Sequence, residues 1–179
     1  NNRVLLSTTL MFMAFNLGAG ILFVWLPILA DRLLGGSAGL YGLLLGAMAL
    51  GEVLASVLSG AVRFPFKLGI LICSAQLLAG LSLSFLSAGL SIPTALISLF
   101  LLGGFSAPLT IWAQTLRMQI IPDGLRGRTF ALPRTMMQAT GPAGGALGGV
   151  LVSLLSAPIL VTLCSLIIGI PAVLGYAVP

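Results

Sequence analysis

The chain has 179 residues, of which 59% are hydrophobic and only 6% are charged, and its mean hydropathy is +1.20. Soluble domains carry about 25% charged residues, so this composition excludes a water-soluble globular protein and predicts an integral membrane protein. The chain has eight basic and three acidic residues, an excess that would suggest nucleic-acid binding in a soluble chain. In a membrane protein, basic residues are better explained by their role in setting the topology, so no nucleic-acid partner is expected.

Charged and turn residues divide the chain into six apolar segments, each close to the roughly 20 residues that a helix needs to cross a bilayer. The predicted spans are residues 4–30, 40–62, 68–88, 94–116, 129–154 and 158–178. The first segment is too long for the core of a signal peptide, and a start at Asn1 rather than Met favours a piece of a longer protein. Runs of this length lack the alternation of barrel strands, so we expect one all-α bundle of six transmembrane helices.

The basic residues indicate how this bundle is oriented. If the six spans alternate in direction, the opposite side of the membrane holds only Arg32, which is offset by Asp31. The other seven bases share one side with both chain ends: Arg3, Arg63, Lys67, Arg117, Arg126, Arg128 and Arg134. Because loops rich in Lys and Arg stay in the cytoplasm, both termini are predicted to be cytoplasmic.

The fifth predicted span is rich in glycine. Gly141, Gly145 and Gly149 fall on one helical face, and Gly144 and Gly148 lie beside them. Such GxxxG spacing allows another helix to approach closely. These glycines could simply pack within the bundle, but their concentration next to Pro142 favours a dedicated interface or a site of bending.

The connection before this span carries the most specific motif of the chain. Residues 122–132 read Pro-Asp-Gly-Leu-Arg-Gly-Arg-Thr-Phe-Ala-Leu and lead into a helix rich in Gly and Pro. This segment resembles the C-terminal half of major facilitator superfamily transporters, and most closely bacterial exporters of the enterobactin-exporter and macrolide-efflux type. The resemblance places the chain in the bacterial inner membrane and implies a missing N-terminal six-helix half as its partner.

The resemblance also implies a role for each span. Such folds combine two halves, each an inverted three-plus-three repeat, around a central cavity. By analogy, spans one and four line the cavity, spans two and five face the N-terminal half, and spans three and six face membrane lipid. The loop between spans two and three departs from the family pattern, since it keeps Gly60, Arg63 and Lys67 but lacks the usual acid. Residues 141–145 are similar to an antiporter signature, which favours export.

No residue set in the sequence indicates an enzyme. The chain has no His, its three acids lie far apart, and it carries no phosphate-binding loop, so neither catalysis nor a metal or cofactor is expected. Glu52 is the one acid inside a predicted span, where a carboxylate is costly unless it is protonated, paired or hydrated. It is a candidate for proton coupling; the alternative is a protonated carboxyl hydrogen-bonded to a neighbouring group. Any basic partner must come from another helix.

Scattered polar and aromatic groups occur in the spans that the resemblance assigns to the cavity. The substrate-cavity candidates are Asn16, Thr110, Trp112, Gln114, Arg134 and Gln138. Each could equally serve helix packing, and Arg134 could instead extend to the cytoplasmic headgroups. In the preceding loop, Arg126 and Arg128 are expected to set topology or contact anionic lipid, and by the resemblance to help close a cytoplasmic gate. Asp123 is expected to cap the next helix.

Together these observations predict the C-terminal half of a secondary active transporter. The expected activity is proton-coupled export of small hydrophobic molecules, drugs or siderophores. The alternative is a non-transporting six-helix subunit that serves as a scaffold in a larger complex. The short loops disfavour this alternative, whereas the absence of a first half favours it.

Overall fold

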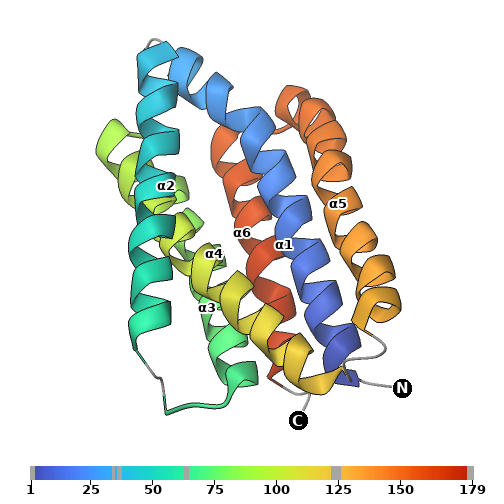
Figure 1. Ribbon diagram of the computed structural model, residues 1–179. Helices are drawn as coiled ribbons and strands as arrows, with labels where there is room; N and C mark the ends of the chain where they lie inside the picture. The colour runs from blue at the N-terminus through green and yellow to red at the C-terminus, as the bar shows by residue number, and fades with distance from the viewer. Residues whose placement is uncertain (1–2, 34, 36–37, 63–64, 122–125, 177–179) are drawn as a thin grey trace.

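A computed structural model of the chain describes residues 3–33, 35, 38–62, 65–121 and 126–176 (Figure 1). Within these ranges the regular structure is entirely helical. The elements are α1 (Arg3–Ile28), a short π-helical extension η1 (Leu29–Leu33), α2 (Ala38–Ala61), α3 (Leu68–Ala88), α4 (Ile92–Ile120), α5 (Arg126–Leu154) and α6 (Ala157–Gly175). Each predicted span therefore corresponds to one helix.

Helix α4 is longer at both ends than the predicted span 94–116. It begins at Ile92 because Ser91 and Thr94 form a capping box and proline is tolerated in the first helical turn. It continues to Ile120, so Arg117, which was expected just beyond the span, lies in the last turn of the helix. This correction matters for the site, because the side chain of Arg117 is packed between helices.

By length and hydropathy, five of the described helices are long and apolar enough to cross a membrane: α1, α2, α3, α4 and α6. In α5, six glycines, two prolines and three arginines lower the hydropathy of the helix. The fifth predicted span, residues 129–154, therefore stays a prediction.

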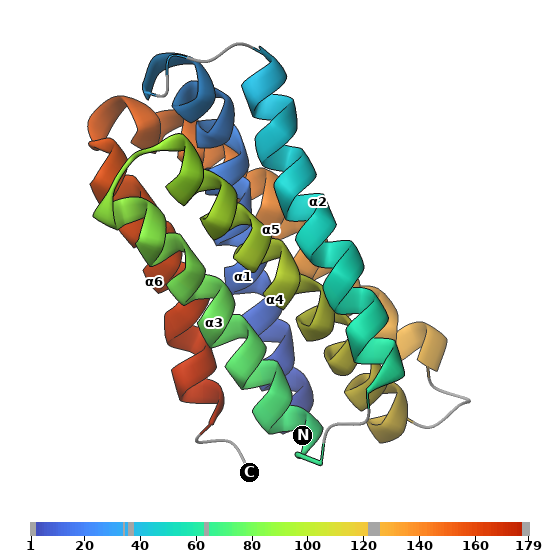
Figure 2. The same ribbon diagram turned by 90° about the vertical axis from the view of Figure 1, so that its left-hand side faces the viewer.

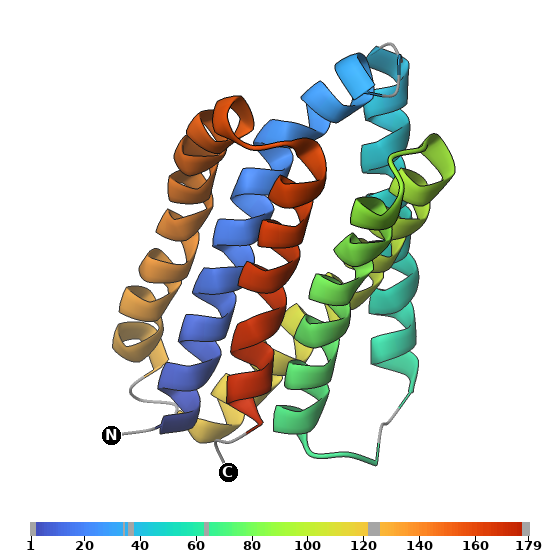
Figure 3. The ribbon, with the colours of Figure 1, turned by 180° about the vertical axis from the view of Figure 1, so that it is seen from behind.

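The helices form a curved row in the order α5, α1, α6, α3, α4, α2 (Figures 1 and 3). The extensive contacts are those between neighbours in this row. The contacts are symmetric between the first three helices and the last three. The pair α1–α5 corresponds to α4–α2, the pair α1–α6 corresponds to α4–α3, and α3–α6 corresponds to itself. Because α1 and α4 run in opposite directions (Figure 1), the chain contains an inverted repeat of two three-helix units.

The four central helices supply nearly all of the core. A larger cluster joins α1 and η1 to α3, α4 and α6 at the end of the bundle that holds η1, and a smaller cluster around Met11, Cys73 and Ala113 lies toward the other end. Among the described hydrophobic residues, α2 buries only Leu44 and α5 only Met137. The outer helices instead expose apolar faces, which include Leu43, Leu50, Val53, Val57 and Leu58 of α2, and Leu147, Val150 and Leu154 of α5.

Candidate functional site

Helices α2 and α4 cross at two glycines, and Figure 2 shows them side by side along the bundle. A β-carbon added to Gly51 of α2 would lie 2.1 Å from the carbonyl oxygen of Phe100, and one added to Gly103 of α4 would lie 2.1 Å from that of Met48. No side chain larger than hydrogen fits at either position without a backbone shift. The two backbones are therefore in direct contact.

Helices α1 and α5 cross in the same way. A β-carbon at Gly20 of α1 would lie 2.2 Å from the carbonyl oxygen of Gly141, and one at Gly144 of α5 would lie 2.2 Å from that of Leu17. The spacing is the same at both crossings. Each of the four glycines lies three residues after the residue whose carbonyl oxygen is approached on its own helix: Gly103 after Phe100, Gly51 after Met48, Gly144 after Gly141 and Gly20 after Leu17. The inverted repeat therefore extends to individual atoms.

Glu52 lies beside the α2–α4 crossing. It follows Gly51 directly, its side chain is half-buried, and its Oε1 is 3.4 Å from the hydroxyl oxygen of Ser106 in α4. The same hydroxyl lies 2.9 Å from the carbonyl oxygen of Gly103. A hydroxyl has one hydrogen to donate, so Ser106 can donate to only one of these two acceptors at a time. The protonation state of Glu52 can therefore change the hydrogen bonding of the crossing.

The α1–α5 crossing carries no acid. The residue that follows Gly144 is Gly145, in the position that Glu52 occupies after Gly51. A β-carbon there would make an ordinary contact, 3.6 Å from Val24 Cγ2. The two repeats thus share their backbone contacts, but of these two glycine positions only the one in α2 is followed by a carboxyl side chain.

The glycines of α5 divide between two sides of the helix. Gly144 and Gly148 pack against α1, with a β-carbon at Gly148 lying 3.0 Å from the α-carbon of Ile21. A β-carbon at Gly149 would meet nothing within 4 Å, and Pro142 is exposed. Packing within the bundle therefore accounts for Gly144 and Gly148, while Pro142 and Gly149 are open to a further partner.

Two of the cavity candidates form hydrogen bonds with helix backbones. Asn16 Nδ2 donates to the carbonyl oxygen of Met137 at 2.8 Å, which ties α1 to α5. Thr110 Oγ1 donates to the carbonyl oxygen of Ser106 at 3.0 Å within α4. Both bonds fit the packing role that the sequence left open.

The other cavity candidates differ in exposure. Trp112 packs against the smaller core cluster. Gln114 of α4 and Arg134 and Gln138 of α5 are exposed. These three side chains remain accessible to a substrate or to another protein.

Arg117 is the residue whose placement the sequence did not reveal. Its side chain is only 2% exposed. One guanidinium nitrogen, Nη2, donates to the carbonyl oxygen of Thr8 and to Met137 Sδ, both at 3.3 Å, and Cζ lies 4.8 Å from the ring centroid of Phe12. Its Nε has no hydrogen-bond acceptor within the described residues. Arg117 thereby connects α4 to α1 and α5.

The predicted loop residues are only partly covered by the structure. Lys67 is exposed and precedes α3 directly. Arg126 and Arg128 lie in the first turn of α5, but their side chains fall outside the described part of the structure. Arg63 and Asp123 lie outside the described residues altogether, so the roles assigned to these four residues remain predictions.

The chain matches the model of a known protein family. A family model described as transmembrane secretion effector matches residues 2–179. A search of curated proteins found no match. The matched range contains all six helices and both glycine crossings, so the family applies to the whole bundle.

Proposed function

Because the chain belongs to the transmembrane secretion effector family of the major facilitator superfamily, we propose that it forms the C-terminal half of a proton-coupled exporter. Family membership and five strongly apolar helices make it a multi-pass membrane transport protein. The inverted repeat of the helix contacts supports a six-span half of this superfamily. The alternative of a non-transporting scaffold gains nothing from the family match.

The observation that carries proton coupling is the position of Ser106 between two acceptors. When Glu52 is ionised, it accepts the Ser106 hydrogen, and the carbonyl oxygen of Gly103 loses that bond. When Glu52 is protonated, it donates to Ser106 Oγ, and Ser106 donates to Gly103 O. Since Gly103 is in backbone contact with Met48, proton binding is transmitted directly to the packing of α2 on α4.

The outer helices supply the surface for the N-terminal half. Both α2 and α5 have few buried residues and expose apolar side chains along their length. The exposed polar side chains of Gln114, Arg134 and Gln138 then face a cavity shared between the halves. An apolar wall with few polar groups suits small hydrophobic molecules or drugs, and the polar side chains could also contact a siderophore. In this arrangement both chain ends lie on the cytoplasmic side of a bacterial plasma membrane.

Flux measurements on the full-length protein in liposomes test this function. Substrate movement driven by an imposed pH gradient is compared between the wild type and Glu52→Gln at matched insertion. The glutamine keeps the shape and hydrogen-bonding capacity of a protonated carboxyl but cannot release the proton. We expect gradient-driven flux to fall to the level seen without a gradient, while exchange of substrate at equal pH persists.

Asp31→Asn is the matched control. Asp31 is exposed in η1, away from the α2–α4 crossing, so its neutralisation is expected to leave gradient-driven flux unchanged. Unchanged flux in Glu52→Gln would show that the coupling proton binds elsewhere in the full-length protein. Absence of flux in the wild type under any gradient would contradict the exporter function itself.

A further inference from the structure

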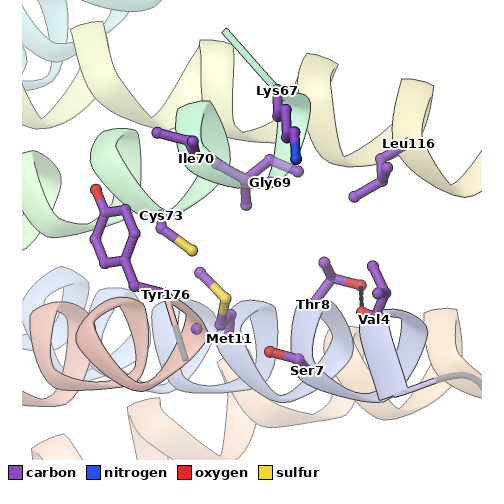
Figure 4. Close-up of a pocket in the computed structure, with 12 residues that line it drawn as sticks. Val4, Ser7, Thr8, Met11, Lys67, Gly69, Ile70, Cys73, Leu116 and Tyr176 are labelled. Carbon is purple, nitrogen blue, oxygen red and sulfur yellow. Dashed lines mark hydrogen bonds between the residues drawn. The ribbon is translucent and has the colours of Figure 1, made fainter. Parts of the chain in front are cut away.

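A pocket lies at the end of the bundle opposite η1, away from the glycine crossings (Figure 4). Its volume is about 390 Å³. It lies between the starts of α1 and α3 and the ends of α4 and α6, with Met11, Cys73, Leu116 and Tyr176 among its lining residues. It is therefore bordered by the four helices that form the core.

Lys67 is the one charged residue among the described residues that line this pocket. Figure 4 shows its amino group directed into the space between α1 and α3. No acidic residue belongs to the same lining set. The pocket thus offers a positive charge at its mouth and apolar walls below it, which suits a ligand that is anionic at one end.

A shallower groove continues from the pocket along α1 and α6, which lie side by side in Figure 3. The two cavities share Ser7, Met11 and Gly175. The groove adds Leu6, Leu10 and Leu174, whose side chains are 62%, 52% and 67% exposed. Arg3 also lines the groove, and none of its described lining residues is acidic. A second cation therefore lies beside an apolar channel that runs along the helices.

We propose that this pocket and groove bind one anionic phospholipid. Its phosphate lies between Lys67 and Arg3, and an acyl chain lies in the groove against Leu6, Leu10 and Leu174. Both cations lie at helix ends, where lipid headgroups meet the ends of spanning helices. The cations lie next to the apolar channel, just as the phosphate of a phospholipid lies next to its acyl chains. This site is independent of the proposed export activity.

Two glycines provide the means to test the pocket. A β-carbon at Gly69, which lines the pocket, would meet nothing within 4 Å, so a larger side chain there fills the cavity without disturbing the helices. Gly89, which directly follows α3, is equally unobstructed but lies outside the pocket. Gly69→Leu and Gly89→Leu therefore form a matched pair that differs in whether the added side chain enters the pocket.

Binding is measured by native mass spectrometry of the full-length protein in detergent, with phosphatidylglycerol or phosphatidylcholine added. We expect phosphatidylglycerol to bind the wild type more tightly than phosphatidylcholine. Lys67→Gln is expected to weaken phosphatidylglycerol binding about fivefold, the effect of one cation near a headgroup. Gly69→Leu is expected to abolish the bound lipid, whereas Gly89→Leu binds like the wild type.

Cys73 gives an independent readout, because it lines the pocket whereas Cys164 is buried outside it. In a Cys164→Ser background, phosphatidylglycerol is expected to slow maleimide labelling of Cys73, and inorganic phosphate alone is not. Equal protection by phosphate would overturn the lipid assignment in favour of a simple anion site. Equal binding of the two lipids, or unchanged binding in both Lys67→Gln and Gly69→Leu, would overturn the site.

Discussion

Gly20 of α1 and Gly103 of α4 make the same contact in the two repeats. A β-carbon on Gly20 would lie 2.2 Å from the carbonyl oxygen of Gly141, and one on Gly103 would lie 2.1 Å from that of Met48. Both distances are more than 1 Å shorter than the roughly 3.3 Å at which a carbon normally meets a carbonyl oxygen. At each crossing, a methyl group added to one of these glycines would therefore be enough to prevent the backbone contact.

The first prediction concerns Gly103→Ala. The added methyl group forces α2 and α4 apart, and such overpacking costs about 1–3 kcal/mol. We expect a lower thermal unfolding midpoint in detergent and reduced gradient-driven flux. Gly89→Ala, where a β-carbon meets nothing within 4 Å, is the control and should match the wild type. A Gly103→Ala protein as stable as this control would show that the crossing is not closely packed.

The second prediction concerns the contact between Phe12 and Arg117. The guanidinium lies over the aromatic ring with Cζ 4.8 Å from its centroid. In a double-mutant cycle of Phe12→Leu with Arg117→Leu, we expect a coupling energy of about 0.5–2 kcal/mol in the free energy of unfolding. A parallel cycle of Phe12→Leu with the exposed Gln114→Leu should be additive. Additivity in the first cycle would mean that Arg117 and Phe12 do not interact.

The sequence predicted the helices of this structure better than the contacts between them. Six helices could be predicted because charges and turn residues interrupt the apolar runs. The partners of Arg117 could not, because Thr8, Phe12 and Met137 come from two other helices. The sequence also did not determine which face of α5 points inward, because its GxxxG spacing occurs in two registers. In the structure, Gly144 and Gly148 face inward because α1 packs against them.

Glu52 is an intermediate case. An acid inside an apolar run could be identified from the sequence alone, along with the need for a partner on another helix. The partner itself, Ser106, was not predicted, because one hydroxyl among many serines in apolar helices has no distinguishing signal. Its importance depends on where α2 crosses α4, which is a property of the folded bundle.

The third prediction concerns membrane topology. Seven of the eight bases are assigned to one side, so reporter fusions after Gly36 and after Gly124 should report opposite sides of the membrane. A fusion after Ser156, between α5 and α6, should report the same side as the fusion after Gly36. This third fusion tests whether the weakly apolar α5 crosses the membrane. If it agrees with the Gly124 fusion instead, α5 does not span.

The fourth prediction concerns the chain expressed alone. Because α2 and α5 expose apolar faces that we assign to the N-terminal half, residues 1–179 by themselves should not move substrate in liposomes. Co-expression with the separate N-terminal half should give a complex that co-purifies in detergent and restores flux. Gradient-driven flux by the purified chain alone would contradict a cavity shared between two halves.

The order of helices in the row has a consequence for biogenesis. Of these six helices, α1 is synthesised before the others, and it packs mainly against α5 and α6, which come after α4. The unit α2–α3–α4 can assemble as soon as α4 enters the bilayer, but α1 stays there without its main neighbours until α5 and α6 have followed. A ribosome that stalls before α5 therefore leaves a nascent chain with one orphan helix, a target for membrane quality control.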